Sequence, residues 1–392
     1  MRILQVISYM YPAWSYGGPG KLVYELSSSL AAKGHEVIVF STDAFGEKRR
    51  DESDNNRLNR KSISYYFFKN LSNTLAFRYK IFLPVNWILS MMQILPTVDV
   101  IHIHEVFTEL AIVTSFFARS LRKPYIISAH GTLDEFHLTH RKDWKKIFIN
   151  LFGKTMFSQA QAFIAATVQE EKEYEVFGVN KIYRIQNGIN LHEFKSLPKS
   201  GNFRSRFNIT QKEKVISFLG RITHLKGLGL LLESFREVCK RIPSHLIIAG
   251  SDDGYLSFLK EQRERLRLTK SVHFPGVLAG EQKKELYRDT DIFVYPSPKE
   301  GFSLAILEAG ASGLPLIVTK GCKFPEVESH RAGMVIPTNG KQLVHSLSYL
   351  LQHDILRKTM GENAKRLIWK NYSVEAMSEK LIHVYETISK GK

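Results

Sequence analysis

Short runs of apolar and β-branched residues recur along this chain, and each is followed by a stretch with helical spacing. Strands that alternate with helices are typical of parallel sheets joined by crossover connections. The series restarts after residue 200, and 392 residues are enough for two domains. The sequence therefore predicts an α/β fold with two doubly wound sheets in tandem. The strand candidates are RILQVIS, HEVIVFS, VDVIHIH, PYIISAH, AFIAAT and IYRIQN, and then KVISFLG, SHLIIAG, SVHFPG, IFVYPS and PLIVTK.

A linker is predicted over residues 187–201, NGINLHEFKSLPKSG, because turn residues are frequent there and periodicity is weak. Such sheets bind ligands beyond the carboxyl ends of their strands. The segments that follow each predicted strand are therefore the places to look for a functional site.

The composition excludes several classes of protein. Two cysteines, Cys239 and Cys322, are too few for a disulfide framework, so a reducing, cytoplasmic setting is expected. The N-terminal apolar run soon reaches Pro12, which makes it a poor signal peptide and a good first strand. The net charge of +17 is spread along the chain without a nucleic-acid-binding motif, so no nucleic acid partner is expected. A diffuse positive charge suits anionic small molecules or an anionic membrane surface.

Residues 81–98 carry no charge and follow an aromatic, basic segment. Pro84 and Pro96 cut this stretch short of a membrane span, which needs about 20 apolar residues. It is interpreted either as a helix buried against the first sheet or as a surface helix that rests on a membrane. In the second case the 65–95 region would touch the membrane, with basic residues near the headgroups: Lys69, Arg78 and Lys80.

A glycine-rich turn, SYGGPG, follows the first predicted strand and opens a helix. Gly17 and Gly18 lack side chains, so a phosphate could approach the backbone there and meet the helix N-terminus. A tight turn would need glycine in any case. The turn does not match G-x-G-x-x-G, and it is not followed by an acidic residue at the position that would bind the ribose of a dinucleotide. Both observations argue against a nicotinamide site.

Two cations flank the turn after KVISFLG. Arg221 and Lys226 are placed where a ligand would lie, and together they could pair with a diphosphate, although ordinary solvated basic residues are the alternative. The segment is not a P-loop.

The stretch KEGFSLAILE, residues 299–308, places one carboxylate before a helix and another inside it. Backbone amides at the helix start would form an anion site on the same face as the two cations. A carboxylate at Glu300 would repel a phosphate bound at such a site, so it is expected to bind a different group. The alternative is that Glu300 is only an acidic residue of the kind favoured near a helix N-terminus. The loop and helix start comprise Gly301, Phe302, Ser303 and Leu304, and Glu308 lies one turn further on.

Asp289 and Asp291 resemble a metal-binding D-x-D pair. They end a helix and start a strand, which is the wrong end of a parallel sheet for a ligand. Asp252 and Asp253 are better placed but lack partners. No metal is therefore expected.

Taken together, the motifs of this chain resemble those of the family 4 glycosyltransferases in order and spacing over nearly its whole length. The most specific part is GR-x4-KG with E-x7-E. The tail NYSVEAMSEKLIHVYETI is similar to the last helix of the family, which crosses back onto the first domain. Departures are Gln186, where proline is usual, and Asp253, where glycine is commoner; neither is expected to touch the phosphate-binding set. The other motifs are YGGPGKLVYELSSSLAAKGHEV, HIHE, AHGTLD, ATVQEEKEY, QNGIN, IAGSDDG, FPGVL and PEVESHRAGMVIP.

The resemblance implies a GT-B fold, with two Rossmann-like domains facing a central cleft. Residues 1–188 would form the acceptor domain, 189–372 the nucleotide-sugar donor domain, and 373–392 the returning helix.

The resemblance also implies the roles of the site residues. Arg221 and Lys226 would hold the donor diphosphate. Glu300 would accept hydrogen bonds from sugar hydroxyls beside the amides of residues 302–304, and Glu308 would bind the ribose. Gly17 and Gly18 would let the first domain close over the phosphates, and His130, after PYIISA, would lie near the anomeric carbon.

The implied activity is that of a retaining, metal-independent hexosyltransferase that uses a nucleotide-diphosphate sugar, in the synthesis of a cell-surface polysaccharide or glycolipid. The acceptor would be a glycan or a lipid-linked group, with peripheral association at the inner face of the membrane. Two alternatives remain open: a sugar-nucleotide epimerase on the same fold, and a non-catalytic sugar-nucleotide sensor or scaffold.

Overall fold

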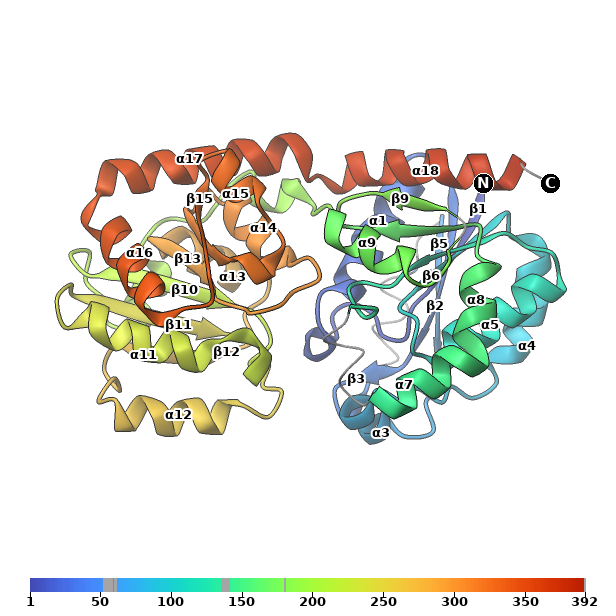
Figure 1. Cartoon of the computed structure of the whole chain (residues 1–392), viewed down its shortest axis with the longest axis horizontal. Coiled ribbons are helices and arrows are strands. Elements are labelled where there is room, and N and C mark those ends of the chain that lie inside the picture. The colour runs from blue at the N-terminus through green and yellow to red at the C-terminus, as the bar shows by residue number, and fades with distance from the viewer. Residues whose placement is uncertain (52–58, 60–61, 135–141, 180, 391–392) are drawn as a thin grey trace. The chain divides into compact units, whose positions relative to one another are not determined.

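A computed structural model describes residues 1–51, 59, 62–134, 142–179 and 181–390 (Figure 1). The chain divides into two compact units. The first comprises Met1–Gly188 together with Val374–Lys392, and the second comprises Ile189–Ser373. The boundaries predicted from the sequence lie after residues 188 and 372, next to the boundaries between these two units.

The first unit contains a seven-stranded parallel sheet in the order β5-β2-β1-β6-β7-β8-β9. The chain moves outward from β1 to β5, then crosses to β6 and moves outward on the other side, so the direction of winding changes between β1 and β6. The strands are β1 Arg2–Val6, β2 Glu36–Thr42, β5 Ile63–Phe68, β6 Val100–His104, β7 Tyr125–Ser128, β8 Ala162–Ala165 and β9 Ile182–Arg184, and a small hairpin is formed by β3 Ala44–Phe45 and β4 Lys48–Arg49.

Helices cover this sheet because their apolar residues recur at helical spacing. In α1, Leu22, Leu26 and Leu30 are all buried, and Pro19 occupies the first helical position, where its missing N–H costs no hydrogen bond. The helices are α1 Pro19–Ala32, α3 Asn73–Tyr79, α4 Trp87–Ile94, α5 Glu109–Ser120, α7 Lys142–Phe148, α8 Lys154–Ser158 and α9 Val168–Glu175, with single turns η1 Trp14–Tyr16 and η2 Leu95–Thr97 and the π-helical turn η3 Ile149–Gly153.

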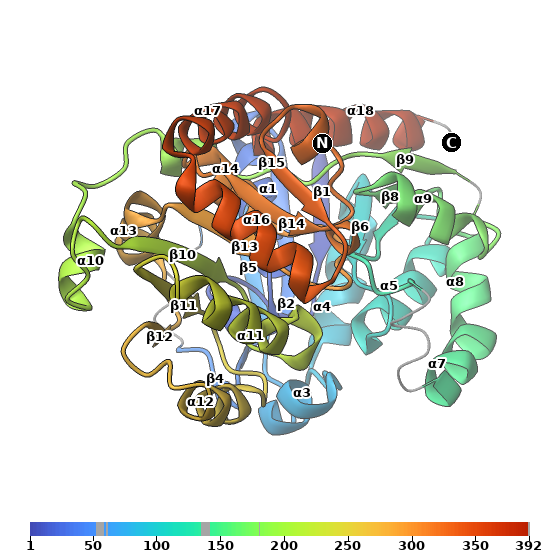
Figure 2. The ribbon, with the colours of Figure 1, turned by 60° about the vertical axis from the view of Figure 1, so that its left-hand side comes forward.

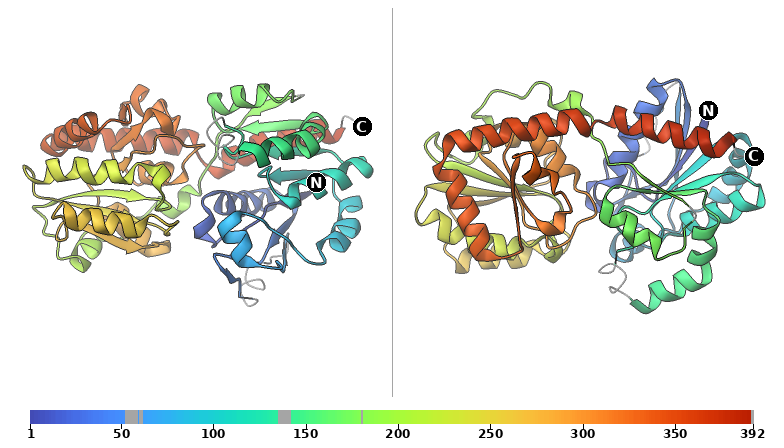
Figure 3. Two further views of the ribbon diagram at one scale, coloured as in Figure 1. Left: turned by 60° about the horizontal axis from the view of Figure 1, so that its bottom comes forward. Right: turned by 45° about the horizontal axis from the view of Figure 1, so that its top comes forward.

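The C-terminal helix α18, Val374–Lys390, belongs to the first unit and packs on α1 (Figure 3). Ser378 Oγ lies 2.8 Å from Ser29 Oγ, and Lys33 forms an ion pair of 2.7 Å with Glu379. Tyr385 of this helix is fully buried. A segment from the far end of the sequence therefore completes the core of the first unit.

The second unit contains a six-stranded parallel sheet in the order β12-β11-β10-β13-β14-β15 (Figure 2). Here the direction of winding changes between β10 and β13. The strands are β10 Lys214–Leu219, β11 Ser244–Ala249, β12 Val272–Gly276, β13 Ile292–Tyr295, β14 Leu316–Thr319 and β15 Gly333–Ile336. The helices are α10 Asn202–Arg206, α11 Leu228–Cys239, α12 Leu256–Arg265, α13 Gly280–Asp289, α14 Leu304–Ala311, α15 Glu326–Ser329, α16 Gly340–Gln352 and α17 Asp354–Asn371, with turns η4 Leu191–Phe194, η5 His224–Lys226 and η6 Lys320–Cys322.

Each predicted strand is present, and the two large sheets contain two further strands, β5 and β15, that were not predicted; the short hairpin of β3 and β4 was not predicted either. β5 is a sheet edge whose aromatic residues face both ways, with Tyr65 buried and Tyr66 exposed, so it lacks the apolar run of a central strand. β15 is four residues long and begins at Gly333. A Cβ at that glycine would lie 1.8 Å from the Leu316 carbonyl oxygen, so close approach to β14 requires a glycine where a strand pattern would show a side chain.

The uncharged stretch at 81–98 is helical over only part of its length. Its helix, α4, begins only at Trp87. Trp87 and Met91 are buried, whereas Leu89 and Met92 are 66% and 54% exposed. One face of α4 therefore packs on the core of the unit, as a helix buried against the sheet would, whereas the other face presents exposed apolar side chains. Contact with a membrane stays a prediction. No helix among the described residues is long and apolar enough to cross a membrane.

Candidate functional site

The loops that follow β10 and β13 leave the same edge of the sheet, since these parallel strands are neighbours. This juxtaposition brings Lys226 of η5 against Glu300 of the β13–α14 loop, and the two side chains form an ion pair. Both are largely buried, with side-chain exposures of 12% and 10%. The predicted cation and the first predicted carboxylate therefore meet in one place.

Close backbone packing holds the two loops together. Gly227 has a positive φ of 68°, and a Cβ there would lie 2.3 Å from the carbonyl oxygen of Pro296. Ser297 Oγ donates to the carbonyl oxygen of Leu225 at 3.1 Å. The amide of Glu300 donates to the carbonyl oxygen of Gly321 at 2.8 Å. The K-G pair of the sequence motif therefore combines a buried, paired cation with a glycine that lets the loops touch.

Tyr295, at the end of β13, lies beside this ion pair and was not predicted as a site residue. Burial acts to lower the pKa of Lys226, but Tyr295 and Glu300 outweigh it, so the pKa of Lys226 is raised. Burial, assisted by the charge of Glu300, raises the pKa of Tyr295 to about 12. At neutral pH the site therefore contains an ammonium group and a protonated phenol. The only feature of the sequence that could have identified Tyr295 as a site residue is its position at the end of a predicted strand.

Arg221 is paired with Asp253, whose carboxylate lies 3.0 Å from its guanidinium. Each side chain is about one third exposed. The expectation that Asp253 does not touch the phosphate-binding set is wrong. The preceding Asp252 accepts from three amides at 3.0 Å, those of residues 254–256, where the chain enters α12. The sequence does not suggest the contact between Arg221 and Asp253, because these residues are 32 positions apart on different loops.

The start of α14 supplies backbone donors. Ser303 is its N-cap but makes no side-chain cap hydrogen bond to the helix; its hydroxyl interacts with Tyr295 instead. The first amides of a helix have no intrahelical acceptor, so those beginning at Leu304 are suited to an anion. Gly301 and Phe302 precede the cap, and the Phe302 ring stacks on Tyr372 with centroids 5.9 Å apart. This packing anchors the loop that bears Glu300.

Glu308 is buried inside α14 and is no solvent-facing acid. Its Oε1 accepts from Lys283 Nζ at 2.7 Å, and its Oε2 accepts from the Tyr287 hydroxyl at 3.1 Å. Carboxylate oxygens can accept more than one hydrogen bond, so this arrangement leaves acceptor capacity for hydroxyl groups. Lys283 and Tyr287 were not predicted; their i,i+4 spacing on α13 is the signal that they share a face.

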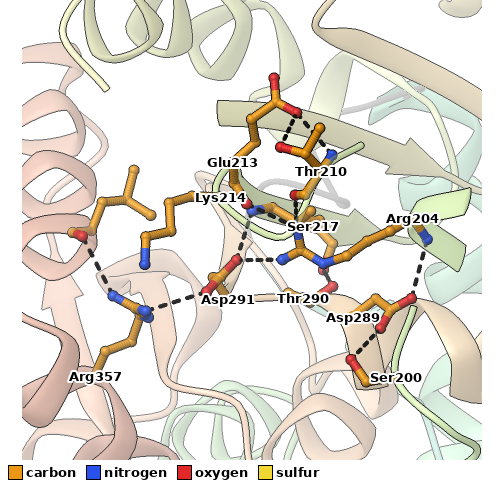
Figure 4. Close-up of polar contacts among 12 residues, drawn as sticks. Ser200, Arg204, Thr210, Glu213, Lys214, Ser217, Asp289, Thr290, Asp291 and Arg357 are labelled. Atoms are coloured by element: carbon orange, nitrogen blue, oxygen red, sulfur yellow. Dashed lines mark hydrogen bonds and ion pairs between the residues drawn. The ribbon is translucent and has the colours of Figure 1, made fainter. Parts of the chain in front are cut away.

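The D-x-D pair has a structural role at the opposite end of the sheet (Figure 4). Asp289 accepts from Ser200 Oγ at 2.9 Å and from three amides of the segment that starts α10. Asp291 pairs with Arg204 at 2.9 Å and Arg357 at 3.2 Å. These carboxylates bind α10 and α17 to the sheet. Among the described residues, no three His, Cys, Asp or Glu side chains gather as metal ligands would.

The remaining predicted residues, Gly17, Gly18 and His130, belong to the first unit. Gly17 has a φ of 114°, and Gly18 is the N-cap of α1. His130 follows β7 with a φ of 52°, and its Nε2 lies 3.0 Å from His104 Nδ1. Burial lowers the pKa of His130 to about 4, so its imidazole is neutral at neutral pH.

Comparison with known proteins identifies relatives over the full length. The family profile described as "Glycosyltransferase Family 4" matches residues 16–193, and that described as "Glycosyl transferases group 1" matches residues 200–367. An uncharacterised glycosyltransferase of Methanocaldococcus jannaschii is 26% identical over 98% of this chain and 97% of its own. The N-acetyl-alpha-D-glucosaminyl L-malate synthase of Bacillus anthracis is 24% identical over 96% of this chain and 94% of its own.

Solved structures give the same fold. HepE of Anabaena, in complex with UDP and glucose, superposes with a TM-score of 0.80 at 18% identity, covering 99% of this chain and all of its own. The sucrose-phosphate synthase of Thermosynechococcus elongatus gives 0.77 at 17% identity over the whole of both chains. With its two parallel-sheet Rossmann-like units, this chain belongs to the family 4 glycosyltransferases and has the GT-B fold.

Proposed function

We propose that this glycosyltransferase is a retaining, metal-independent hexosyltransferase that moves a sugar from a nucleotide-diphosphate sugar to an acceptor hydroxyl. The observation that carries the proposal is the meeting of Lys226, Glu300 and the start of α14 at the edge where β10 and β13 end. A cation and free amides suit a diphosphate, whereas a carboxylate suits sugar hydroxyls. HepE, whose structures contain UDP and UDP-glucose, supports the same type of donor.

In this proposal the second unit binds the donor and the first unit binds the acceptor. Lys226 and Arg221 exchange their present carboxylate partners, Glu300 and Asp253, for oxygens of the diphosphate. Glu300 is then released to accept from donor sugar hydroxyls, and Glu308 accepts from the ribose. Gly17 and Gly18 allow the phosphates to approach the backbone of the first unit.

In the proposed reaction, the site accelerates transfer by stabilising the nucleotide diphosphate as it leaves the donor sugar. As the bond to the anomeric carbon breaks, negative charge grows on the diphosphate and is balanced by Lys226, Arg221 and the α14 amides. The departing phosphate oxygen takes the proton of the acceptor hydroxyl, which attacks from the face that the diphosphate leaves. Retention follows from that geometry without a covalent intermediate.

A lipid-linked acceptor, and a place at the inner face of the cytoplasmic membrane, are proposed from the surface of α3 and α4. Apolar side chains are exposed on α3, on α4 and just before α3, basic residues lie on or next to α3, and the chain carries a net charge of +17. Such a surface suits an anionic membrane. We define the α3–α4 surface by its exposed apolar residues Leu71, Leu75, Tyr79, Ile88, Leu89 and Met92 and the basic residues Lys69, Arg78 and Lys80. The product would be a cell-surface polysaccharide or glycolipid.

The activity is tested in two steps. A thermal-shift panel of UDP-, GDP- and ADP-sugars identifies the donor, because a ligand that binds only the folded state raises its stability. Nucleotide release is then measured with and without candidate acceptors, and the anomeric configuration of the product is read by NMR. Release that needs no acceptor would favour an epimerase, an inverted anomer would contradict retention, and activity lost in EDTA and restored by Mn²⁺ would contradict metal independence.

The membrane proposal is tested by flotation with vesicles that contain anionic lipid. The double substitution Leu89→Glu and Met92→Glu should abolish salt-sensitive binding. Ile355→Glu is a matched control, since Ile355 is an 85% exposed apolar residue on α17 of the other unit. Equal binding by all three proteins would contradict the proposal.

A further inference from the structure

A chain of buried polar side chains leads from His130 into the core of the first unit. Beyond His130, His104 Nε2 lies 2.6 Å from Gln5 Oε1, and Gln5 Nε2 donates to the Tyr385 hydroxyl at 3.4 Å. That hydroxyl lies 2.7 Å from His102 Nδ1, and His102 Nε2 lies 2.8 Å from Ser128 Oγ. Gln5, His102, His104, Ser128 and Tyr385 are each at least 95% buried. An uninterrupted hydrogen-bonded network in such an interior is cooperative.

The network is assembled from segments that are distant in sequence. Gln5 lies on β1, directly across from His102 on β6. His104 ends the same strand, and Ser128 ends its neighbour β7. Tyr385 comes from α18, 380 residues from Gln5. The returning helix therefore supplies a hydroxyl to a network that ends at a predicted site residue.

The orientation of the Gln5 amide determines where the protons lie. Its oxygen faces His104, so His104 Nε2 must carry a proton and donate. A neutral imidazole has one N–H, which leaves His104 Nδ1 as an acceptor. His130 Nε2 must then donate to it, and His130 Nδ1 carries no proton.

The other end of the chain agrees with this direction. Because the Gln5 amide nitrogen donates to the oxygen of the Tyr385 hydroxyl, that hydroxyl can in turn donate its own hydrogen bond to His102 Nδ1. His102 Nε2–H then donates to Ser128. Burial, with the neighbouring imidazoles, lowers the pKa of both His102 and His104 well below the ordinary value. All three histidines are therefore neutral with the proton on Nε2.

We propose that Gln5, His104 and Tyr385 are positioning residues that hold His130 as a neutral imidazole whose Nδ1 accepts a hydrogen bond from a hydroxyl of the donor sugar. The proposal rests on the proposed function and on the position that the family resemblance implies for His130, near the anomeric carbon of the donor sugar. As the leaving group departs, that carbon gains positive charge, which an imidazolium would destabilise. A neutral acceptor avoids this repulsion and orients the sugar.

The test measures the imidazoles directly. Full-length protein labelled with ¹⁵N-histidine is examined by long-range ¹H–¹⁵N NMR, and His130 is assigned from the signals that disappear in His130→Asn. At pH 7 the wild-type His130 should show a protonated Nε2 and an unprotonated Nδ1. A proton on Nδ1, or a charged ring, would overturn the proposal whether or not any sugar is transferred.

The variant Tyr385→Phe removes the hydroxyl that orients the Gln5 amide. The amide can then turn over, so the His130 signals should move toward a mixture of tautomers. The KM for the donor should rise about three- to tenfold, as for one lost hydrogen bond, while the Kd of the free nucleotide diphosphate is unchanged. Tyr125→Phe is the matched control, because this buried hydroxyl of the same unit donates instead to Met156 O at 2.6 Å.

Unchanged His130 signals in Tyr385→Phe, or equal changes in Tyr125→Phe, would overturn the positioning role. If Tyr385→Phe does not fold, Gln5→Met removes the amide itself and the same signals decide. Failure of the wild type to transfer any sugar would contradict the proposed function instead, and the tautomer measurement would still stand.

Discussion

The two units bring different electrostatics to their candidate residues. In the second unit these residues form ion pairs: Lys226 with Glu300, Arg221 with Asp253 and Lys283 with Glu308. In the first unit His130 ends a chain of neutral imidazole, amide and hydroxyl groups. Fixed charges suit a ligand that is itself a dianion, whereas neutral groups suit a position where charge develops only during reaction. Under the proposed function, the contrast would correspond to a division of roles, in which the second unit holds the donor and the first unit assists bond cleavage.

The largest effect is expected from Glu300→Gln. The amide retains the shape of the carboxylate but accepts more weakly from sugar hydroxyls, so turnover should fall by about two orders of magnitude or more. The Kd of the free nucleotide diphosphate should change little, because it has no donor sugar. Calorimetry beside an acceptor-dependent assay separates the two. Normal turnover would reduce Glu300 to an acid that merely favours the start of α14.

Arg221→Ala should act in the opposite way, because it removes a partner of the diphosphate. Binding of the sugar nucleotide and of the free nucleotide diphosphate should weaken together, by about ten- to a hundredfold, which corresponds to about 1.5–3 kcal/mol for one charge-assisted hydrogen bond. Lys226→Ala should behave similarly. Calorimetry with both ligands measures this, and Arg236→Ala on α11 is a control. Loss of sugar-nucleotide binding alone would contradict the assignment to the diphosphate.

The neutral network should make stability sensitive to acid. The pKa of His130 is about 4 in the folded protein, below the ordinary 6.5 that it regains on unfolding. The unfolded chain therefore binds the proton first, and stability should fall as the pH decreases from about 6.5 to about 4. His130→Asn should reduce the slope by up to one proton, or about 1.4 kcal/mol per pH unit. Urea unfolding at several pH values measures it, and an identical slope in the variant would show that His130 is protonated in the folded state.

The smallest effect is expected from Asp253→Asn. The carboxylate competes with a diphosphate for Arg221, but both side chains are about one third exposed, so the competition is weak. Binding of the nucleotide diphosphate should tighten about two- to fivefold, as for a surface ion pair of up to about 1 kcal/mol. Glu237→Gln, which removes the exposed carboxylate that pairs with Lys240, is the matched control. Weaker binding in Asp253→Asn would mean that Asp253 orients Arg221 rather than competing for it.

Much of the fold could be read from the order of residues. Parallel strands buried on both faces appear as continuous apolar runs, so β8, β13 and β14 were predictable. The edge strand β5 and the glycine-led β15 were not, because neither shows such a run. The spacing of Arg221, Lys226 and Glu300 identified the strand ends at which the candidate site lies.

The set of elements and the residue types at their ends follow from the sequence alone, because strand and helix periodicity and turn chemistry are local. The partner of each polar side chain follows instead from how the chain folds. Asp253 meets Arg221, Lys283 meets Glu308, and Tyr385 meets Gln5 because sheet order and helix packing bring distant segments together. The same packing places Asp289 against the start of α10 and Asp291 against Arg357 of α17, whereas the D-x-D spacing alone would also suit a metal site. A buried charged or polar group must have a hydrogen-bonding or charged partner, so its role depends on the group that the tertiary structure brings next to it.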